Sequence, residues 1–232
     1  MTKSKRKLTP KTALKRLKHA FQQELGISSA TATGLLDGAK LYDKAYELSC
    51  VIQTVQELKA QDPSRSFVLV GGSSLTFRNK GGPIQRSTWP YVEVRTQGHA
   101  VAELWVDIEF TALSAWKQNK NISYPTYGLA HELDILLVKP KSSDRPTPDQ
   151  IYLGIEAKHR EFSKALLKEL LGVRREMCYK SKGKNLFAWW QPIGILPASP
   201  ASGLVLFCSG ANVPNYTDPA TFWGLCMVHK SC

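Results

Sequence analysis

Apolar residues recur with helical spacing in two long segments of the chain. From Leu41 to Ala60 a stripe of leucine, valine and isoleucine follows the 3.6-residue period, and Asp62-Pro63 ends it. A second stripe begins at Phe162 and continues to about Tyr179. The pattern therefore predicts two amphipathic helices, one near the start of a main domain and one in its second half.

Strand-like patterns fill the space between these helices and follow the second one. Residues 100–112 alternate, and the predicted inward side comprises Ala102, Leu104, Val106, Ile108 and Phe110. Residues 131–138 and 151–158 form two further strands, which a charged, proline-rich connection makes antiparallel partners. Short apolar runs at 67–70 and 204–208 complete the set, and 73–90 reads as a long loop. This order predicts an α/β fold in which a mixed sheet is flanked by helices.

The first eighteen residues carry much of the charge. The chain of 232 residues has a formal net charge of +12. Eight basic residues and no acid lie in this stretch, namely Lys3, Lys5, Arg6, Lys7, Lys11, Lys15, Arg16 and Lys18. A helical pattern after Thr9-Pro10 predicts a basic N-terminal helical arm over 1–34, followed by a main domain over 35–232. Such an arm suits non-specific contact with nucleic acid phosphates, and equally a solvated face that docks on the core or on a second subunit.

Composition excludes several classes of protein. The five cysteines are scattered, which fits free thiols better than a disulfide framework. We find neither an apolar run long enough for a membrane span nor a signal-peptide core behind the first lysines. We therefore expect a cytoplasmic protein with no membrane partner.

Two of the predicted strands bring acidic and basic groups together. In 131–138 the apolar residues Leu133, Ile135 and Leu137 share one side, so Asp134 projects from the other. The same parity places Glu156 and Lys158 together on the polar side of the next strand. If the two strands pair directly, these side chains line one small site.

Hard oxygen ligands of this kind suit Mg²⁺, which takes one or two carboxylates plus waters and phosphate oxygens. Asp134 and Glu156 supply such a pair, and the backbone carbonyl of Ala157 between the two strand residues is a further candidate ligand. Lys158 can orient or help deprotonate a metal-bound water, or balance charge in the transition state. The chemistry expected of this set is hydrolysis of a phosphodiester, with Mn²⁺ as a substitute metal.

The aspartate followed by Glu-Ala-Lys at the end of the next strand, and then by a helix, resembles the active-site motif of the PD-(D/E)XK, or restriction-endonuclease-like, nuclease superfamily. The resemblance covers roughly residues 41–208. It implies a core of helix, three strands, helix and strand, and an acidic metal ligand on the first helix, for which Glu47 is the first candidate and Glu57 the second. Leu133 stands where the motif has proline, a substitution common in the superfamily.

The implied activity is that of a metal-dependent DNA endonuclease in restriction or other defence, in transposition or in repair. The resemblance also implies DNA-backbone contacts from Arg160, Lys164 and Arg175. The glycine-containing loop offers Arg78 and Lys80 for phosphate contact, but it lacks a Walker-type ending. Cleavage of both strands would require a homodimer or a partner complex.

Other interpretations stay open at this stage. The same fold could serve as a catalytically silent nucleic-acid-binding or assembly subunit, or as an RNA-directed nuclease. The acidic residues Glu103, Asp107 and Glu109 could bind metal, although a solvated strand face is the interpretation we favour for them. Tryptophans 189, 190 and 223 could stack on bases, but core or interface positions are the usual ones for this residue.

Overall fold

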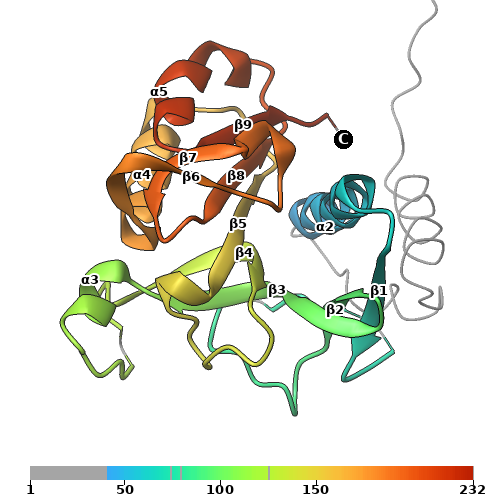
Figure 1. The fold of residues 1–232 in the computed structure, drawn as a ribbon. Coiled ribbons are helices and arrows are strands. Elements are labelled where there is room, and N and C mark those ends of the chain that lie inside the picture. The colour runs from blue at the N-terminus through green and yellow to red at the C-terminus, as the bar shows by residue number, and fades with distance from the viewer. Residues whose placement is uncertain (1–40, 74, 79, 125, 232) are drawn as a thin grey trace, which may run out of the picture.

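The computed structural model describes residues 41–73, 75–78, 80–124 and 126–231 (Figure 1). In this part of the chain a seven-stranded mixed sheet is accompanied by a two-stranded hairpin and four α-helices. The α/β class and the mixed sheet with flanking helices are thus confirmed. The basic arm predicted over 1–34, and the domain boundary after it, lie outside the described residues.

The sheet has the order β1-β2-β3-β4-β5-β8-β9. Its first five strands form an antiparallel meander, and β8 and β9 then add in parallel to β5. The strands are β1 (Arg65–Val70), β2 (Tyr91–Thr96), β3 (His99–Thr111), β4 (Ala130–Val138), β5 (Ile151–Lys158), β8 (Gly203–Cys208) and β9 (Leu225–His229). Strands β4 and β5 are antiparallel neighbours, as the proline-rich connection predicts.

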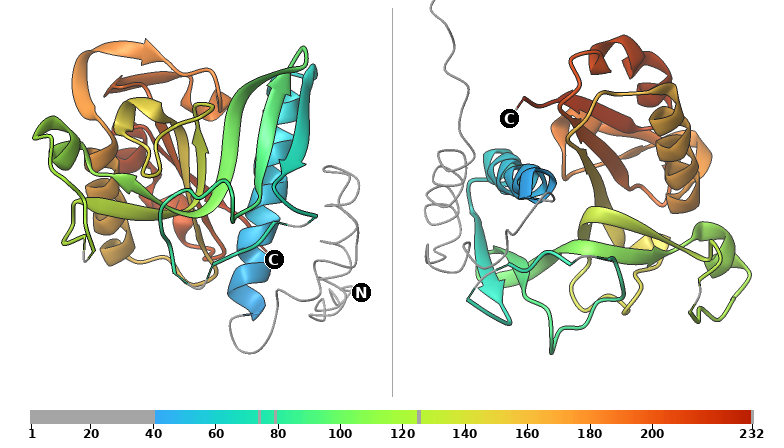
Figure 2. Two further views of the ribbon diagram at one scale, coloured as in Figure 1. Left: turned by 90° about the horizontal axis from the view of Figure 1, so that it is seen from below. Right: turned by 180° about the vertical axis from the view of Figure 1, so that it is seen from behind.

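Helices cover both faces of the sheet around β5 and β8. They are α2 (Leu41–Gln61), α3 (Leu113–Lys117), α4 (Lys164–Met177) and α5 (Thr217–Phe222), and the hairpin consists of β6 (Tyr179–Leu186) and β7 (Ile195–Ser199). Both views of the ribbon place α2 on one side of β5 and α4 on the other (Figure 2). The core divides accordingly into one buried cluster with α2 and a second with α4.

Most of the predicted helices and strands agree with the structure, but the structure also contains several elements that the sequence patterns did not predict. The two long helices and strands β1, β3, β4, β5 and β8 lie where the patterns put them, and the described part of 73–90 is a loop between β1 and β2. Strands β2, β6, β7 and β9 and the short helices α3 and α5 were not predicted. Among the described residues no helix combines the length and apolarity needed to cross a bilayer.

The predicted single inward side of β3 is wrong. Leu104 and Val106 pack in the α2 cluster, whereas Ile108 and Phe110 pack in the α4 cluster. The change occurs at Asp107, whose φ of 52° lies in the left-handed region and interrupts the alternation of the strand. Side chains therefore alternate regularly between the two faces of the sheet before Asp107 and again after it, but the alternation does not continue through this residue.

Strand β4 changes sides at the same level. Leu133 packs in the α4 cluster, while Ile135 and Leu137 pack in the α2 cluster, so the predicted common side of these three residues is also wrong. The register runs from Val106↔Ile135 to Ile108↔Leu133 and omits the rung of residues 107 and 134. Two aspartates thus meet where the ladder is interrupted.

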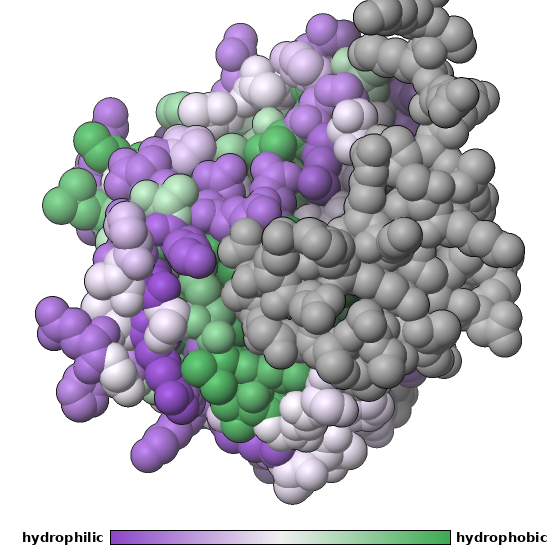
Figure 3. Space-filling model, turned by 90° about the vertical axis from the view of Figure 1, so that its right-hand side faces the viewer, coloured by the Kyte–Doolittle hydropathy of each residue, from purple (hydrophilic) through white to green (hydrophobic). Residues whose placement is uncertain are grey.

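The surface on the side of β1 and α2 is chemically mixed. In a space-filling view of that side, an apolar area is visible with polar side chains along part of its edge (Figure 3). Phe67, Leu69 and Phe77 are partly buried against the α2 cluster. This side of the described structure is therefore not uniformly charged.

Candidate active site

The three predicted catalytic residues meet where β4 and β5 begin to separate. The paired register ends at Ile135↔Ile155, and Asp134 and Glu156 are the next residues along the two strands. Asp134 Oδ2 accepts a hydrogen bond from the backbone N–H of Ala157 at 2.7 Å. Lys158 Nζ lies 3.5 Å from the same oxygen and forms an ion pair with Glu156. The structure therefore brings together the residues that parity and an assumed register had grouped.

Both β5 side chains of this set are largely removed from water. Burial, together with the charge of Asp134, raises the pKa of Glu156 to about 8. Burial alone would lower the pKa of Lys158, but the charges of Asp134 and Glu156 outweigh it and raise the pKa above its ordinary value. Lys158 is consequently an ammonium group throughout the neutral pH range.

Helix α2 adds a second ion-paired group beside the first. Lys44 Nζ lies 2.6 Å from Glu47 Oε2 and 3.1 Å from Asp107 Oδ1. Burial raises the pKa of Glu47 to about 7, and the charges of Asp134 and Asp107 contribute to this rise. Glu47, the acidic residue predicted on the first helix, is therefore electrostatically coupled to the β4 carboxylate.

Asp107, which the sequence offered as a possible metal ligand but which we expected on a solvated face, is a member of this group. The residue is 2% exposed, and its Oδ2 accepts a hydrogen bond from the backbone N–H of Arg78 at 2.6 Å. Burial raises its pKa, and Lys44 opposes that rise. The acidic pattern on β3 drew attention to the residue, but only the inversion of the strand places it on the side of α2.

The expectation that Glu103, Asp107 and Glu109 form a solvated face is wrong. Glu103 is 3% exposed and accepts hydrogen bonds from Arg86, Trp105 and the backbone of Lys141. Glu109 is also buried, between the hydroxyl of Tyr124 and the guanidinium of Arg145. Loops that fold over β3 cover these acids, and a strand pattern contains no signal of such loops.

The side chains of the site that could bind a metal ion are carboxylates, which offer oxygen atoms as ligands. The carboxylates of Asp134, Glu156 and Glu47 come from β4, β5 and α2, and Lys44 and Lys158 are the cations beside them. Among the described residues, no three or more histidine, cysteine, aspartate and glutamate side chains lie so that together they could hold a metal ion. Burial raises the pKa of the Cys226 thiol in β9, and the charge of Glu57, ten residues further along α2, adds to that rise.

The predicted phosphate-contacting residues occupy different environments. Arg78 is buried, its Nη1 donates to the carbonyl of Pro83 at 2.9 Å, and its guanidinium lies over the ring of Trp89. It organises the loop before β2 and presents no exposed charge. The remaining four side chains are exposed, namely Lys80, Arg160, Lys164 and Arg175.

The tryptophans divide between core and surface. Trp190 is buried in the α2 cluster, and Trp189 stacks on Tyr152 with the ring centroids 4.6 Å apart. Trp223 remains 41% exposed just beyond α5. The core position that is usual for tryptophan is thus confirmed for Trp190 and not for Trp223.

No family model, curated protein or solved structure matches this chain.

Proposed function

We propose that this protein is a metal-dependent endonuclease of the restriction-endonuclease-like type that hydrolyses phosphodiester bonds in DNA. The observation that carries the proposal is the meeting of Asp134, Glu156 and Lys158 at the separating ends of β4 and β5. The chain order supports it, because α2, β3, β4, β5, α4 and β8 follow the order of helix, three strands, helix and strand that the resemblance implies, with β1, β2, α3 and the β6–β7 hairpin as additional elements between them.

The donor set fits Mg²⁺, with Mn²⁺ as a substitute. Asp134 and Glu156 supply two hard carboxylates, the number that Mg²⁺ commonly takes from protein, and the Ala157 carbonyl and Glu47 are further ligand candidates. The raised pKa values of Glu156 and Glu47 support this assignment, because they reflect buried carboxylates with too little positive charge beside them. When bound, the metal would polarise the scissile phosphate and acidify a water.

Lys158 acts in this proposal as a cation and not as a base. Its pKa is raised, so it keeps its proton at neutral pH and can donate hydrogen bonds to the attacking water or to a phosphate oxygen. Asp134 holds the Ala157 amide at 2.7 Å and thereby orients the strand segment between the two β5 side chains. Exposed Lys80, Arg160, Lys164 and Arg175 are the candidates for DNA-backbone contact.

Cleavage assays with matched variants test the proposal. The full chain is incubated with supercoiled plasmid, linear duplex, single-stranded DNA and RNA, each in Mg²⁺, Mn²⁺ or EDTA. Asp134→Asn and Lys158→Met should each reduce metal-dependent nicking at least about 100-fold, since each removes a group that stabilises the reacting charge. Asp218→Asn and Lys168→Met make the same chemical changes at exposed positions and should leave the rate within about twofold.

Three results would count against the proposal. Nucleic-acid binding without cleavage in any metal would indicate a silent binding or assembly subunit. Cleavage of RNA alone would reassign the substrate. Equal loss in the exposed control variants would show that the effect is not local to the site.

Nicking without linearisation would agree with a single site that cuts one strand at a time, so that double-strand cleavage needs a second copy or a partner.

A further inference from the structure

A pocket of about 540 Å³ that contains none of the site carboxylates lies between α4, the β6–β7 hairpin and the residue after α5. Its lining includes Gly172, Arg174 and Arg175 of α4, Tyr179 and Lys180 of β6, and Trp223. The volume falls within the range of about 300–1,000 Å³ typical of small-molecule sites. The metal-binding carboxylates and Lys158 are not part of this lining, and Arg175 is the one lining residue that the proposed function also uses, as a candidate DNA-backbone contact.

The lining is basic, with three cationic residues and no acidic one. Arg174 is 2% exposed, its Nε donates to the carbonyl of Trp223 at 2.9 Å, and its Nη1 donates to Ser202 Oγ at 3.1 Å. Its Nη2 has no hydrogen-bond partner among the described residues. A buried guanidinium held only by neutral groups is costly, and an anion in the adjoining pocket would offset that cost.

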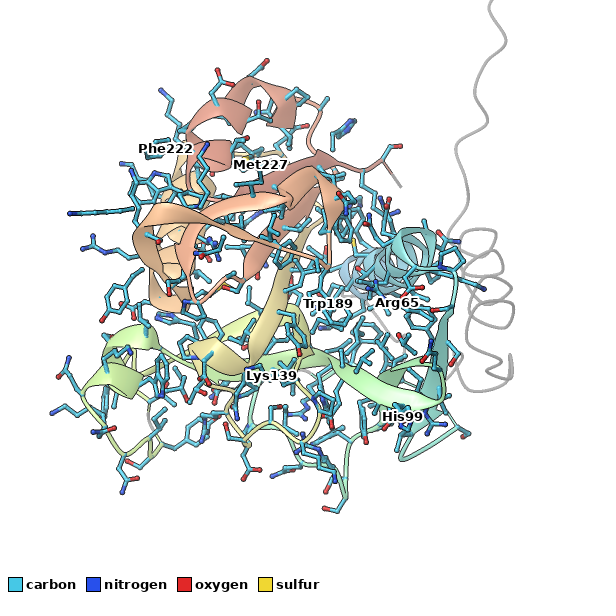
Figure 4. All side chains as sticks on the ribbon, in the orientation of Figure 1. Arg65, His99, Lys139, Trp189, Phe222 and Met227 are labelled. Atoms are coloured by element: carbon cyan, nitrogen blue, oxygen red, sulfur yellow. The ribbon has the colours of Figure 1, made fainter. Side chains whose placement is uncertain are left out.

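Aromatic side chains form the open side of the same pocket. Tyr179 is 52% exposed and Trp223 41% exposed, although both are large and partly apolar. Lys180 Nζ lies 5.0 Å from the centroid of the Trp223 ring and 3.8 Å from that of Phe222. The stick view places Phe222 at this end of the molecule, beside the hairpin (Figure 4). Cations next to exposed rings are the combination that binds a phosphate together with a stacked base.

We propose that this pocket binds a nucleotide. The phosphate lies near Arg175 and Lys180, in the positive potential of buried Arg174, and the base stacks on Trp223 or Tyr179. The nucleotide is either free or one unit of a single strand, and both share this chemistry. The inference does not rest on the proposed nuclease activity, because binding here needs neither the carboxylates nor a metal.

Calorimetric titration in EDTA tests the proposal on the full chain. The probes are dTMP, thymidine, inorganic phosphate and a hexamer of thymidylate. We expect dTMP to bind more tightly than either thymidine or phosphate alone, because it alone engages both the cations and the rings. A hexamer that binds much more tightly than dTMP identifies a strand as the source of the nucleotide, and equal affinity identifies the free nucleotide.

Two variants separate the pocket from general surface charge. Gly172→Met should fill the pocket without removing charge or weakening α4, because a Cβ at Gly172 meets nothing within 4 Å and methionine is a better helix former. Lys180→Glu should reverse one charge at the mouth. Each should weaken dTMP binding at least about tenfold, the equivalent of one charge-assisted hydrogen bond. Lys168→Glu reverses an exposed charge on the same helix outside the lining and should change affinity by less than about twofold.

The proposal is overturned if no probe binds, if Lys168→Glu weakens binding as much as Lys180→Glu, or if Gly172→Met binds like the unaltered chain. Phosphate that binds as tightly as dTMP would also overturn it, because the rings would then contribute nothing. Every titration is made in EDTA, so a failure of nucleotide binding does not count against the proposed nuclease activity. Loss of nicking in Asp134→Asn likewise does not count against the proposed nucleotide pocket.

Discussion

Asp107 of β3 and Asp134 of β4 face each other at the rung that the β3–β4 ladder omits. Asp107 has a positive φ there, and both strands change the core cluster into which they pack. Each carboxylate is then held by a backbone amide, Asp107 by that of Arg78 and Asp134 by that of Ala157. An interruption of regular pairing thus turns two acids from neighbouring strands toward α2 and β5.

The positive φ of Asp107 can be tested by comparing two substitutions. Asparagine tolerates the left-handed region and keeps an oxygen for the Arg78 amide, so Asp107→Asn should cost about 1 kcal/mol through its weaker bond to Lys44. Valine is strained there and leaves that amide unpaired, so Asp107→Val should cost about 3 kcal/mol or more. Urea denaturation of the two variants measures both costs, and equal stability would contradict the assignment of strain.

Glu103 should behave as a structural residue and not as a metal ligand. Its two oxygens accept Lys141 N–H at 2.8 Å, Trp105 Nε1–H at 3.0 Å and Arg86 Nη2–H at 2.6 Å. Glu103→Ala leaves the buried Trp105 Nε1–H and the part-buried Lys141 N–H unpaired and should lower the free energy of unfolding by about 3 kcal/mol.

Chemical denaturation, with and without Mg²⁺, checks this prediction. Glu161→Ala removes an exposed glutamate and should stay within about 0.5 kcal/mol of the unaltered chain. If Mg²⁺ stabilised the unaltered protein but not Glu103→Ala, the residue would belong to the metal site after all.

The pKa of Glu156 predicts how stability depends on pH in EDTA. The folded value of about 8 lies above the ordinary 4.5, because burial and Asp134 disfavour the ionised form. Glu156 therefore contributes stability that is fully present below about pH 4.5 and is lost as the pH rises through about 8. Lys158 on β5 and Glu169 on α4 also act on this carboxyl, in opposite directions.

Melting temperatures measured between pH 5 and pH 9 in EDTA test this dependence. The unaltered chain should lose stability over that range, and Glu156→Gln should lose less because it cannot ionise. Glu161→Gln, an exposed change of the same kind just beyond β5, should follow the unaltered chain. A Glu156→Gln curve parallel to that of the unaltered chain would show that another group is responsible.

Local patterns sufficed for the elements that carry Asp134, Glu156 and Lys158. Strands β4 and β5 have strong apolar alternation and a proline-rich connection, so their bounds and pairing could be predicted. The long, regular stripe of α2 predicted the helix that carries Glu47, and the resemblance implied that an acidic residue of this helix belongs to the site. The apolar period thus located the strands that carry these groups, but the side on which Asp134 lies follows from the interrupted rung of β3 and β4 and not from strand parity.

Other features depend on contacts that no local pattern encodes. The sequence of β6, Tyr179–Leu186, is polar and lysine-rich, and it is a strand because β7 pairs with it. The inner side chains of β3 move from one core cluster to the other because of the positive φ of Asp107. A prediction from apolar alternation counts an aspartate as an ordinary polar residue and so does not detect this change. Glu103 and Glu109 are buried by loops from distant parts of the chain. Their own hydropathy indicated exposure, because it contains no information about those loops.

Strand β5 is paired on both sides, with β4 along one edge and β8 along the other. The amides of its doubly paired part, which ends at Ile155, are protected until one of these neighbours detaches, so opening that part costs more free energy than opening an edge strand. Glu156 and Lys158 directly follow this part and stay in register with Leu206 and Cys208 of β8. Their geometry is set before any ligand arrives, and little of the binding energy is spent on ordering them.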